Sequence, residues 1–339
     1  MRPSVDYLST MNAVPSPPAL TPVVLPARTI GPPTTISAEA RAALAFAAST
    51  PVTSYPEPAD LEGWQRATEA SAAIWDPVAE EMLARCRCRL DTQGIAGVTT
   101  YLCTPEDAAE VDRYLYLYIH GGAFVFGSGR FAMAFGAKAA DELGVRTVSV
   151  DYRTPPHHPF PAALEDCFAV YRQLLAEAPD RKIVIGGSSA GGNLAAAVTL
   201  LIRDRGLKLP SALILLTPEV DLTESGDSFR TNALLDVNLK RGVPECNALY
   251  AAGHDLTDPY LSPLFGDFTR GFPPTLIQSG TRDVFLSNSV LMHRKLRRAG
   301  IAAELHVWEA MPHAGFGFGP VPENEEIAAE LRHFIARHC

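Results

Sequence analysis

Residues 182–202 read KIVIGGSSAGGNLAAAVTLLI, and this stretch decides the fold. Its first part, Lys182–Ile185, is a short apolar run that predicts a strand, and the alanine- and leucine-rich segment 191–204 predicts a helix. Between them, residues 187–191 read GSSAG and match the pattern G-x-S-x-G. A serine at such a strand-to-helix turn is held clear of the backbone, as a nucleophile requires. We therefore predict that Ser189 is a nucleophile.

The residues around Ser189 support this interpretation. The turn is so tight that side chains at the flanking glycine positions would collide with neighbouring elements. The N-terminus of the following helix also favours negative charge that develops near the serine. A plain Gly/Ser-rich loop and a phosphate-binding turn are the alternatives. Ser188 is the competing hydroxyl, but only Ser189 has glycines at the required positions.

A second motif follows another apolar run. Residues 114–119, YLYLYI, predict a fully buried strand, and residues 120–124 read HGGAF. The pair Gly121-Gly122 lets backbone N–H groups point into a cleft, which is what an oxyanion hole requires. A plain turn is the alternative. We expect His120 to support this loop rather than to act as a base.

An acid and a base follow two later strands. Asp283 lies after the strand TLIQ, and His313 lies in a Pro/Gly loop after the strand ELHVW. The order Ser189…Asp283…His313 is that of an α/β-hydrolase. In that arrangement His313 takes the proton from Ser189, and Asp283 orients and stabilises the imidazole. We interpret the following residues as structural or solvated: Asp255, Asp258, His157, His158, His254, His293 and His306.

Working outward from these motifs, strand and helix patterns alternate along the chain. Alternation of short strands with helices predicts βαβ units, a mainly parallel sheet and helices on both of its faces. The predicted strands are 87–91, 98–103, 114–119, 146–151, 182–185, 212–216, 275–278 and 303–307, and the first two are predicted to form a hairpin. The predicted helices are 131–143, 161–177, 191–204, 286–299 and 323–337. Residues 222–253 predict an irregular helical insert.

The N-terminal part has a different composition. Residues 1–35 are rich in Pro, Ser and Thr, which favours extended backbone. Helices are predicted at 37–49, at 59–70 and, after Asp76-Pro77, at 76–86. We therefore divide the chain into an N-terminal arm and helical cap segment, 1–90, and a catalytic domain, 91–339. A tail that only stabilises the fold is the alternative for the arm.

Composition and charge exclude several classes of protein. The chain has 339 residues, 47% of them hydrophobic, and a formal net charge of −9. That charge makes it a poor partner for nucleic acid. It contains no C-x-x-C pair, no zinc-site spacing and no run of the ~18 apolar residues that span a bilayer. No apolar h-region follows a basic start near residue 1, so we expect no signal peptide. We expect a cytoplasmic protein with reduced cysteines, no membrane partner and no metal or organic cofactor.

Taken together, the motifs resemble one known family. HGGAFVFG, DYRTPPHHPFPAALED, GGSSAGGNLA, SGTRDVFLSNS and WEAMPHAGFGF are similar to those of the hormone-sensitive-lipase-like esterases within the α/β-hydrolase superfamily. The resemblance covers roughly residues 95–338. It implies an eight-stranded sheet and a cap built from N-terminal helices plus the insert. It also implies hydrolysis of carboxylic esters with short or medium acyl chains, and for some members of lactones.

Two residues depart from the family pattern. Ala123 stands where the family usually has a third glycine, and Ser188 stands where it often has aspartate. By resemblance, the oxyanion donors are the N–H groups of Gly122, Ala123 and Ala190. Alanine can still donate there if its φ is allowed.

These observations predict a serine carboxylic ester hydrolase that works through an acyl-enzyme on a small-molecule ester or lactone. Phe124 and Phe126, with Tyr55 and Trp64 from the cap, would shape an apolar pocket, although ordinary core packing is the alternative for each. A non-catalytic ligand-binding protein on the same fold is one further alternative, and an amidase or peptidase is another. Monomer and homodimer are both open.

Overall fold

The computed structural model describes residues 22–106 and 114–339, and the chain divides into two compact units, Met1–Gly31 and Pro32–Cys339. Of the first unit, residues 22–31 are described, and they contain no helix or strand. The helices and strands of the described residues all lie in the second unit.

In the described residues of this unit, eight strands form one sheet in the order β1-β2-β4-β3-β5-β6-β7-β8. The pairs β1–β2 and β2–β4 are antiparallel, and all other neighbours are parallel. The predicted mostly parallel eight-stranded sheet is therefore confirmed. The strands are β1 (Cys88–Ile95), β2 (Val98–Pro105), β3 (Tyr114–Ile119), β4 (Thr147–Val150), β5 (Lys182–Ser188), β6 (Ala212–Leu216), β7 (Thr275–Gly280) and β8 (Ala303–Trp308).

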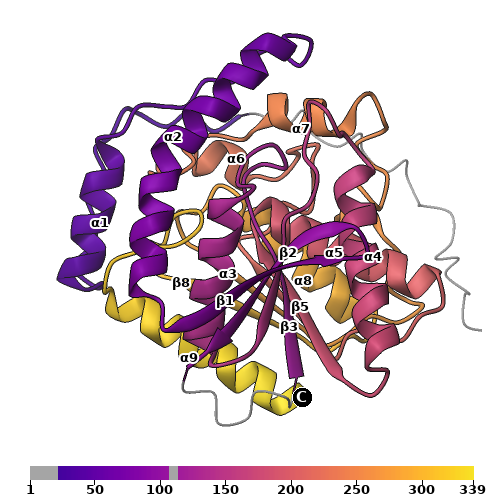
Figure 1. The fold of residues 1–339 in the computed structure, drawn as a ribbon. Helices are drawn as coiled ribbons and strands as arrows, with labels where there is room; N and C mark the ends of the chain where they lie inside the picture. The colour runs from indigo at the N-terminus through magenta and orange to yellow at the C-terminus, as the bar shows by residue number, and fades with distance from the viewer. Residues whose placement is uncertain (1–21, 107–113) are drawn as a thin grey trace, which may run out of the picture. The chain divides into compact units, whose positions relative to one another are not determined.

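Helices cover both faces of the sheet (Figure 1). One face packs against α3 and α9, and the opposite face packs against α4, α5 and α8. The helices are α1 (Ala38–Ala48), α2 (Leu61–Arg85), α3 (Arg130–Leu143), α4 (Ala162–Glu177), α5 (Ala190–Asp204), α6 (Ser228–Thr231), α7 (Pro244–Ala251), α8 (Leu286–Arg298) and α9 (Pro322–His338), with a 3₁₀ turn η1 (Pro263–Phe265). The helices predicted beyond residue 86 are present, and they differ from the prediction only at their ends.

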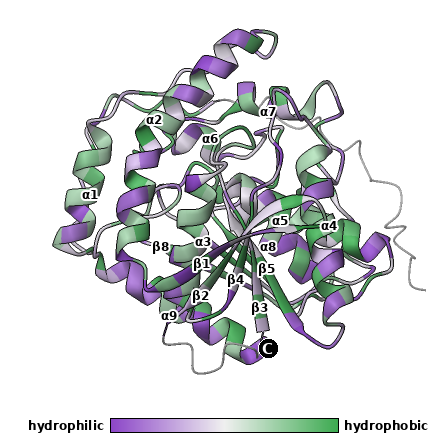
Figure 2. Cartoon of the chain, in the orientation of Figure 1, coloured by the Kyte–Doolittle hydropathy of each residue, from purple (hydrophilic) through white to green (hydrophobic). Residues whose placement is uncertain are grey.

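The two layers of core follow from the alternation of side chains along a strand. On β3, Leu115 and Leu117 belong to the apolar cluster under α4 and α5, whereas Tyr116 and Tyr118 belong to the cluster under α3 and α9. Because both faces are covered, the strand is apolar at every position, as the sequence indicated. Figure 2 shows the hydrophobic colour along the central strands, whereas the surrounding helices carry both hydrophobic and hydrophilic colours.

A tight hairpin joins β1 and β2 at the antiparallel edge. Ile95 pairs with Val98, so the loop has two residues, Ala96 and Gly97, and both have positive φ angles of 51° and 82°. Such a loop matches the right-handed twist of the strands it connects. The hairpin predicted from residues 87–103 is therefore confirmed, although β1 extends further than predicted, to Ile95.

One prediction for the N-terminal part is wrong. Separate helices at 59–70 and 76–86 were expected because proline removes a backbone hydrogen bond inside a helix. Instead, α2 continues from Leu61 to Arg85 with Pro77 inside it. Both halves of α2 bury side chains, Trp64 in the first half and Met82 in the second. This burial offsets the cost of the proline.

The sheet topology brings the loops of interest to one edge. Strands β5, β6, β7 and β8 are parallel neighbours, so their carboxyl ends lie side by side. In open α/β sheets this is the edge where ligands bind. The predicted insert, residues 222–253, follows β6 and contains α6 and α7. None of the helices in the described residues combines the length and the apolar character needed to cross a bilayer.

Candidate active site

Ser189 sits on a strained turn between β5, which ends at Ser188, and α5, which begins at Ala190. Its φ and ψ angles are 59° and −123°, a conformation that residues with a side chain rarely adopt. Its N–H donates to the carbonyl of Leu216 on the neighbouring strand at 2.9 Å, which ties the turn to the sheet.

Close backbone contacts explain the two glycines of the motif. A Cβ atom at Gly187 would lie 2.4 Å from the carbonyl oxygen of Ile119, and one at Gly191 would lie 2.0 Å from the same oxygen. These contacts are with rigid backbone at the end of β3. Any side chain at either position would therefore displace the nucleophile turn or the strand beside it.

The structure brings His313 to Ser189. His313 lies in the loop after β8, and its Nε2 is 2.9 Å from Oγ of Ser189. The imidazole is almost fully buried, with 6% of the residue exposed. With the imidazole proton on Nδ1, Nε2 accepts a hydrogen bond from the hydroxyl of Ser189.

Asp283 completes this hydrogen-bonded chain. Its Oδ1 lies 3.2 Å from Nδ1 of His313 and accepts the N–H of Phe285 at 2.9 Å. Its Oδ2 accepts the hydroxyl of Ser279 at 2.7 Å. The carboxylate is completely buried, so these bonds fix its orientation. Neither Ser279 nor Phe285 was identified from the sequence.

The charges around His313 favour its protonated form. Burial alone lowers the pKa of this imidazole, but the hydrogen bond and charge of Asp283, with the charge of Asp236, outweigh burial and raise the pKa above its ordinary value. The ring of Phe285 packs edge-on against the imidazole at 4.7 Å between centroids. The site thus combines a base with the negative charge needed to stabilise it after it takes a proton.

The loop after β3 has the backbone geometry of a donor site. Gly122 has a φ of 119°, and a Cβ atom there would lie 2.2 Å from the carbonyl oxygen of Phe126. Ala123 has a φ of 50°, in the left-handed region that alanine tolerates at some cost. A Cβ atom at Gly121 would lie 3.3 Å from Cβ of Ser189, so this loop passes directly beside the nucleophile. Ala190 contributes the first N–H of α5, which has no partner within the helix.

His120 packs against this loop and supports it. Its ring stacks on Tyr152 with centroids 4.1 Å apart, and its Nδ1 lies 2.7 Å from the carbonyl oxygen of Gly121. Tyr152 in turn donates its hydroxyl to the carbonyl of His120 at 3.0 Å. Burial lowers the pKa of His120, so its ring is neutral and suited to packing.

The four aromatic residues predicted to shape a pocket separate into two groups. Phe126 lies next to Trp64 and Tyr55, with ring centroids 6.3 Å and 6.0 Å away. These three rings belong to one apolar cluster with Ala123. Phe124 points elsewhere, since it is fully buried and stacks on Tyr250 at 4.2 Å. The packing interpretation therefore suits Phe124 better than it suits Phe126.

The acids and histidines interpreted as structural lie in ordinary surroundings. Asp255 and Asp258 accept backbone N–H groups two residues ahead of them, and His306 lies 3.3 Å from Glu304 on β8. The remaining ones are exposed or half-buried, and none of them is hydrogen-bonded to Ser189, Asp283 or the His313 side chain: His157, His158, His254 and His293.

Three polar residues in the insert were not identified from the sequence. Asp236, Asn232 and Asn238 form hydrogen bonds to the loops that contain Asp283 and His313. They lie in a stretch without regular periodicity, so no pattern marked them. Only their position, within the helical insert predicted at residues 222–253, could have drawn attention to them.

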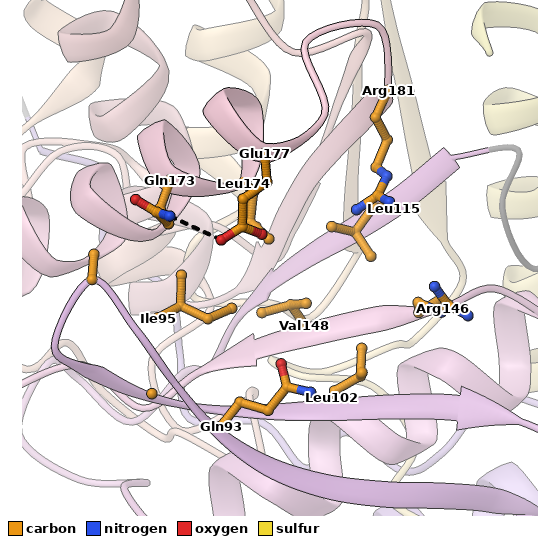
Figure 3. A pocket seen from close by; sticks show the side chains of 12 residues that line it. Gln93, Ile95, Leu102, Leu115, Arg146, Val148, Gln173, Leu174, Glu177 and Arg181 are labelled. Atoms are coloured by element: carbon orange, nitrogen blue, oxygen red, sulfur yellow. Dashed lines mark hydrogen bonds between the residues drawn. The ribbon is translucent and has the colours of Figure 1, made fainter.

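A separate cavity of about 270 Å³ lies between α4 and the strands β1–β4. Figure 3 shows its lining, in which Gln173 donates to Glu177 from above and Leu115 and Val148 rise from the sheet. None of the predicted site residues lines it. We therefore assign the candidate site to Ser189 and not to this cavity.

The arrangement around Ser189 supports nucleophilic attack. The hydroxyl, the imidazole and the carboxylate form one chain, with a backbone-donor loop beside the hydroxyl. A nucleophile hydrogen-bonded to a base that a third group orients is the general form of such a site.

Comparison with known proteins also indicates a hydrolase. A family model described as the alpha/beta hydrolase fold matches residues 116–317. An acetyl-hydrolase of Streptomyces hygroscopicus is 36% identical over 241 residues, which span 69% of this chain and 79% of that protein. An esterase of Acinetobacter venetianus is 33% identical over 224 residues, spanning 65% and 74%.

Solved structures extend the similarity to nearly the whole chain. The crystal structure of esterase E25 has a TM-score of 0.87 at 34% identity and covers 94% of this chain and 99% of that one. An esterase from the bacterial hormone-sensitive lipase family has a TM-score of 0.75 at 31% identity, covering 89% and 98%. Fold, motifs and relatives thus agree: the chain belongs to the hormone-sensitive-lipase-like esterases of the α/β-hydrolase superfamily and is a carboxylesterase.

Proposed function

We propose that this carboxylesterase works through an acyl-enzyme formed on Ser189. The observation that supports this most directly is the hydrogen-bonded chain from Ser189 through His313 to Asp283. His313 accepts the serine proton as the hydroxyl attacks the ester carbonyl, and then gives that proton to the leaving alcohol. Water, activated by the same imidazole, attacks the acyl-enzyme and releases the acid.

The oxyanion of each tetrahedral intermediate would be bound by the N–H groups of Gly122, Ala123 and Ala190. Support comes from the positive φ angles of Gly122 and Ala123 and from the contact of this loop with Ser189. Donors fixed before the reaction cost no reorganisation when charge develops. The methyl group of Ala123 adds apolar surface beside them.

The cap segment and the insert would close the acyl side of the site. Support comes from the cluster in which Trp64 of α2 and Val243 at the start of α7 pack with Phe126 of the oxyanion loop and Phe285 beside His313. An acyl group bound there would be surrounded by these rigid aromatic rings. We therefore propose that the substrates are esters of short to medium acyl length, or lactones of comparable size.

A panel of p-nitrophenyl esters of rising chain length, assayed beside lactones and an anilide, tests this proposal. We expect kcat/KM to peak at a short or medium ester, with the anilide far slower. An intermediate that carries the acyl group on Ser189, trapped at low pH and detected by mass spectrometry, would establish the acyl-enzyme. Preference for the anilide, or a label on another residue, would contradict the proposal.

A further inference from the structure

Asp236 lies in the insert between α6 and α7, and it is completely buried. Its carboxylate accepts four backbone N–H groups. Oδ2 accepts those of Val284 at 2.9 Å and His313 at 3.0 Å. Oδ1 accepts those of Asn238 at 3.0 Å and Leu239 at 3.1 Å. One oxygen thus joins the loops that follow β7 and β8, while the other anchors the carboxylate to its own turn.

Two asparagines of the insert bind the carbonyl groups of the same loops. Asn232 donates through Nδ2 to the carbonyl of Asp283 at 2.8 Å. Asn238 donates through Nδ2 to the carbonyls of His313 at 2.7 Å and Gly315 at 2.9 Å. Side chains of the insert therefore bind both N–H groups and carbonyl groups of these two loops.

We propose that Asp236 is a positioning residue for catalysis, which fixes the spacing between the loop of Asp283 and the loop of His313. The proposal rests on the roles given above to Ser189, Asp283 and His313. Asp236 touches neither the imidazole nor the hydroxyl through a hydrogen bond, so it acts through the backbone. Small errors in such positions are costly, because a displacement of about 1 Å can lower a rate about 100-fold.

The charge of Asp236 reinforces this role. It lies close enough to Asp283 and His313 for each to influence the other. Burial, and then the charge of Asp283, raise the pKa of Asp236 above its ordinary value, although His313 and the N–H groups of Val284 and Leu239 act to lower it. The anion of Asp236 is therefore most favoured when the imidazole is protonated, as it is in the transition state. Asp236 consequently stabilises that state by charge as well as by geometry.

Asp236→Asn tests the proposal with minimal change of shape. An amide offers one acceptor oxygen, so its NH₂ group must face one pair of N–H donors and two bonds are lost. We expect kcat for a p-nitrophenyl ester to fall about 10- to 100-fold with KM within about threefold. We also expect the apparent pKa of the acid limb of kcat/KM to move down, because a negative charge near His313 is gone. A merely structural role would lower the thermal unfolding temperature without this selective loss of kcat over KM.

Asp221→Asn is the matched control. Asp221 is also a buried carboxylate, immediately before the same insert, but its hydrogen-bond partners are Thr223 and Ser225. We expect its kcat to stay within about threefold of the parent. Circular dichroism and thermal unfolding check that both variants are folded.

Ser189→Ala separates failure of this proposal from failure of the proposed function. If Ser189→Ala is inactive while Asp236→Asn keeps the parent's kcat and acid-limb pKa, Asp236 has no positioning role. If Ser189→Ala stays active, the assignment of the nucleophile is wrong instead. Should Asp236→Asn not fold, Asn238→Ala removes the two bonds of Asn238 to the His313 loop and leaves the bond from the His313 N–H to Asp236 in place. We expect a 3- to 10-fold lower kcat for it. A rate within twofold of the parent would mean that the turn of Asp236 and Asn238 does not position the His313 loop, which overturns the proposal.

Discussion

The hydroxyl of Ser189 lies 2.9 Å from Nε2 of His313, although 124 positions separate the two residues in the sequence. Their approach depends on the parallel order of β5, β6, β7 and β8, which places the turn after β5 and the loop after β8 on one edge. Each side chain is then fixed locally, Ser189 by its strained turn and His313 by burial and by Asp283. The pair is ready for proton transfer without rearrangement of the backbone.

Replacing the nucleophile should abolish hydrolysis. We expect Ser189→Ala to lower kcat by about 10⁴- to 10⁶-fold, since members of such a triad act as a unit. Ser188→Ala is the control, because its hydroxyl belongs to the last residue of β5 and lacks the flanking glycines. Steady-state assays with a p-nitrophenyl ester distinguish them. The assignment fails if Ser189→Ala keeps a tenth of the activity and Ser188→Ala loses it.

Activity should rise with pH through the ionisation of His313. The imidazole must be neutral to accept the serine proton, so kcat/KM falls as the pH drops below its pKa. Asp283 and Asp236 raise that pKa, so the midpoint of the limb should lie above the ordinary ~6.5. Asp283→Asn removes the nearer charge and should both slow the reaction and move the midpoint down. A profile that is flat from pH 5 to 8 in the parent protein would contradict the role of His313.

Removing an aromatic ring of the cap cluster should change acyl preference. Phe126 packs beside Trp64 and Tyr55 near the oxyanion loop, so Phe126→Ala opens space next to the acyl group. We expect the optimum of kcat/KM to move toward longer p-nitrophenyl esters, by two or more carbons. Phe168→Ala, a half-buried phenylalanine on α4, is the control and should leave the optimum in place. If the optimum is unchanged in both variants, Phe126 does not line the pocket that holds the acyl group.

The second glycine of the nucleophile turn should not tolerate a methyl group. A Cβ atom at Gly191 meets the carbonyl oxygens of Ile119 and His120 at 2.0 Å and 2.5 Å. Gly191→Ala must therefore displace the turn or the oxyanion loop, and we expect at least a 100-fold loss of kcat/KM or no folded protein. Gly94→Ala, on the edge strand β1, meets no atom within 4 Å and should behave as the parent. Full activity of Gly191→Ala would show that the close contacts are not rigid.

Much of the fold followed from local patterns. The apolar runs of β3 and β6 and the hairpin of β1 and β2 were predicted because each depends on neighbours in the sequence. The prediction that the helix is broken at Pro77 was wrong because the continuity of α2 depends on contacts that are not local in the sequence. Its continuity depends on burial of Trp64 and Met82 against distant parts of the chain, which no local rule includes.

The site shows the same division. The turn at Ser189 has a strict local geometry, so its sequence is recognisable. Asp236 has no such signature, because its partners are backbone N–H groups of residues far along the chain. Almost every residue type has a backbone N–H, so the residues that carry these groups need not be of any particular type. Polar residues that act on distant backbone are therefore visible only in a structure.

The backbone of Ser189 has a consequence for how such a protein evolves. Glycine adopts its φ of 59° and ψ of −123° without penalty, whereas other residues lose about 1–3 kcal/mol there. Ser189→Gly should therefore be more stable toward urea than Ser189→Ala, although both are inactive; equal midpoints would mean that the turn relaxes. Selection for stability alone would thus replace the nucleophile with glycine. Retention of serine at this position is a continuing stability–activity trade-off, in which every functional descendant is less stable than its inactive glycine variant.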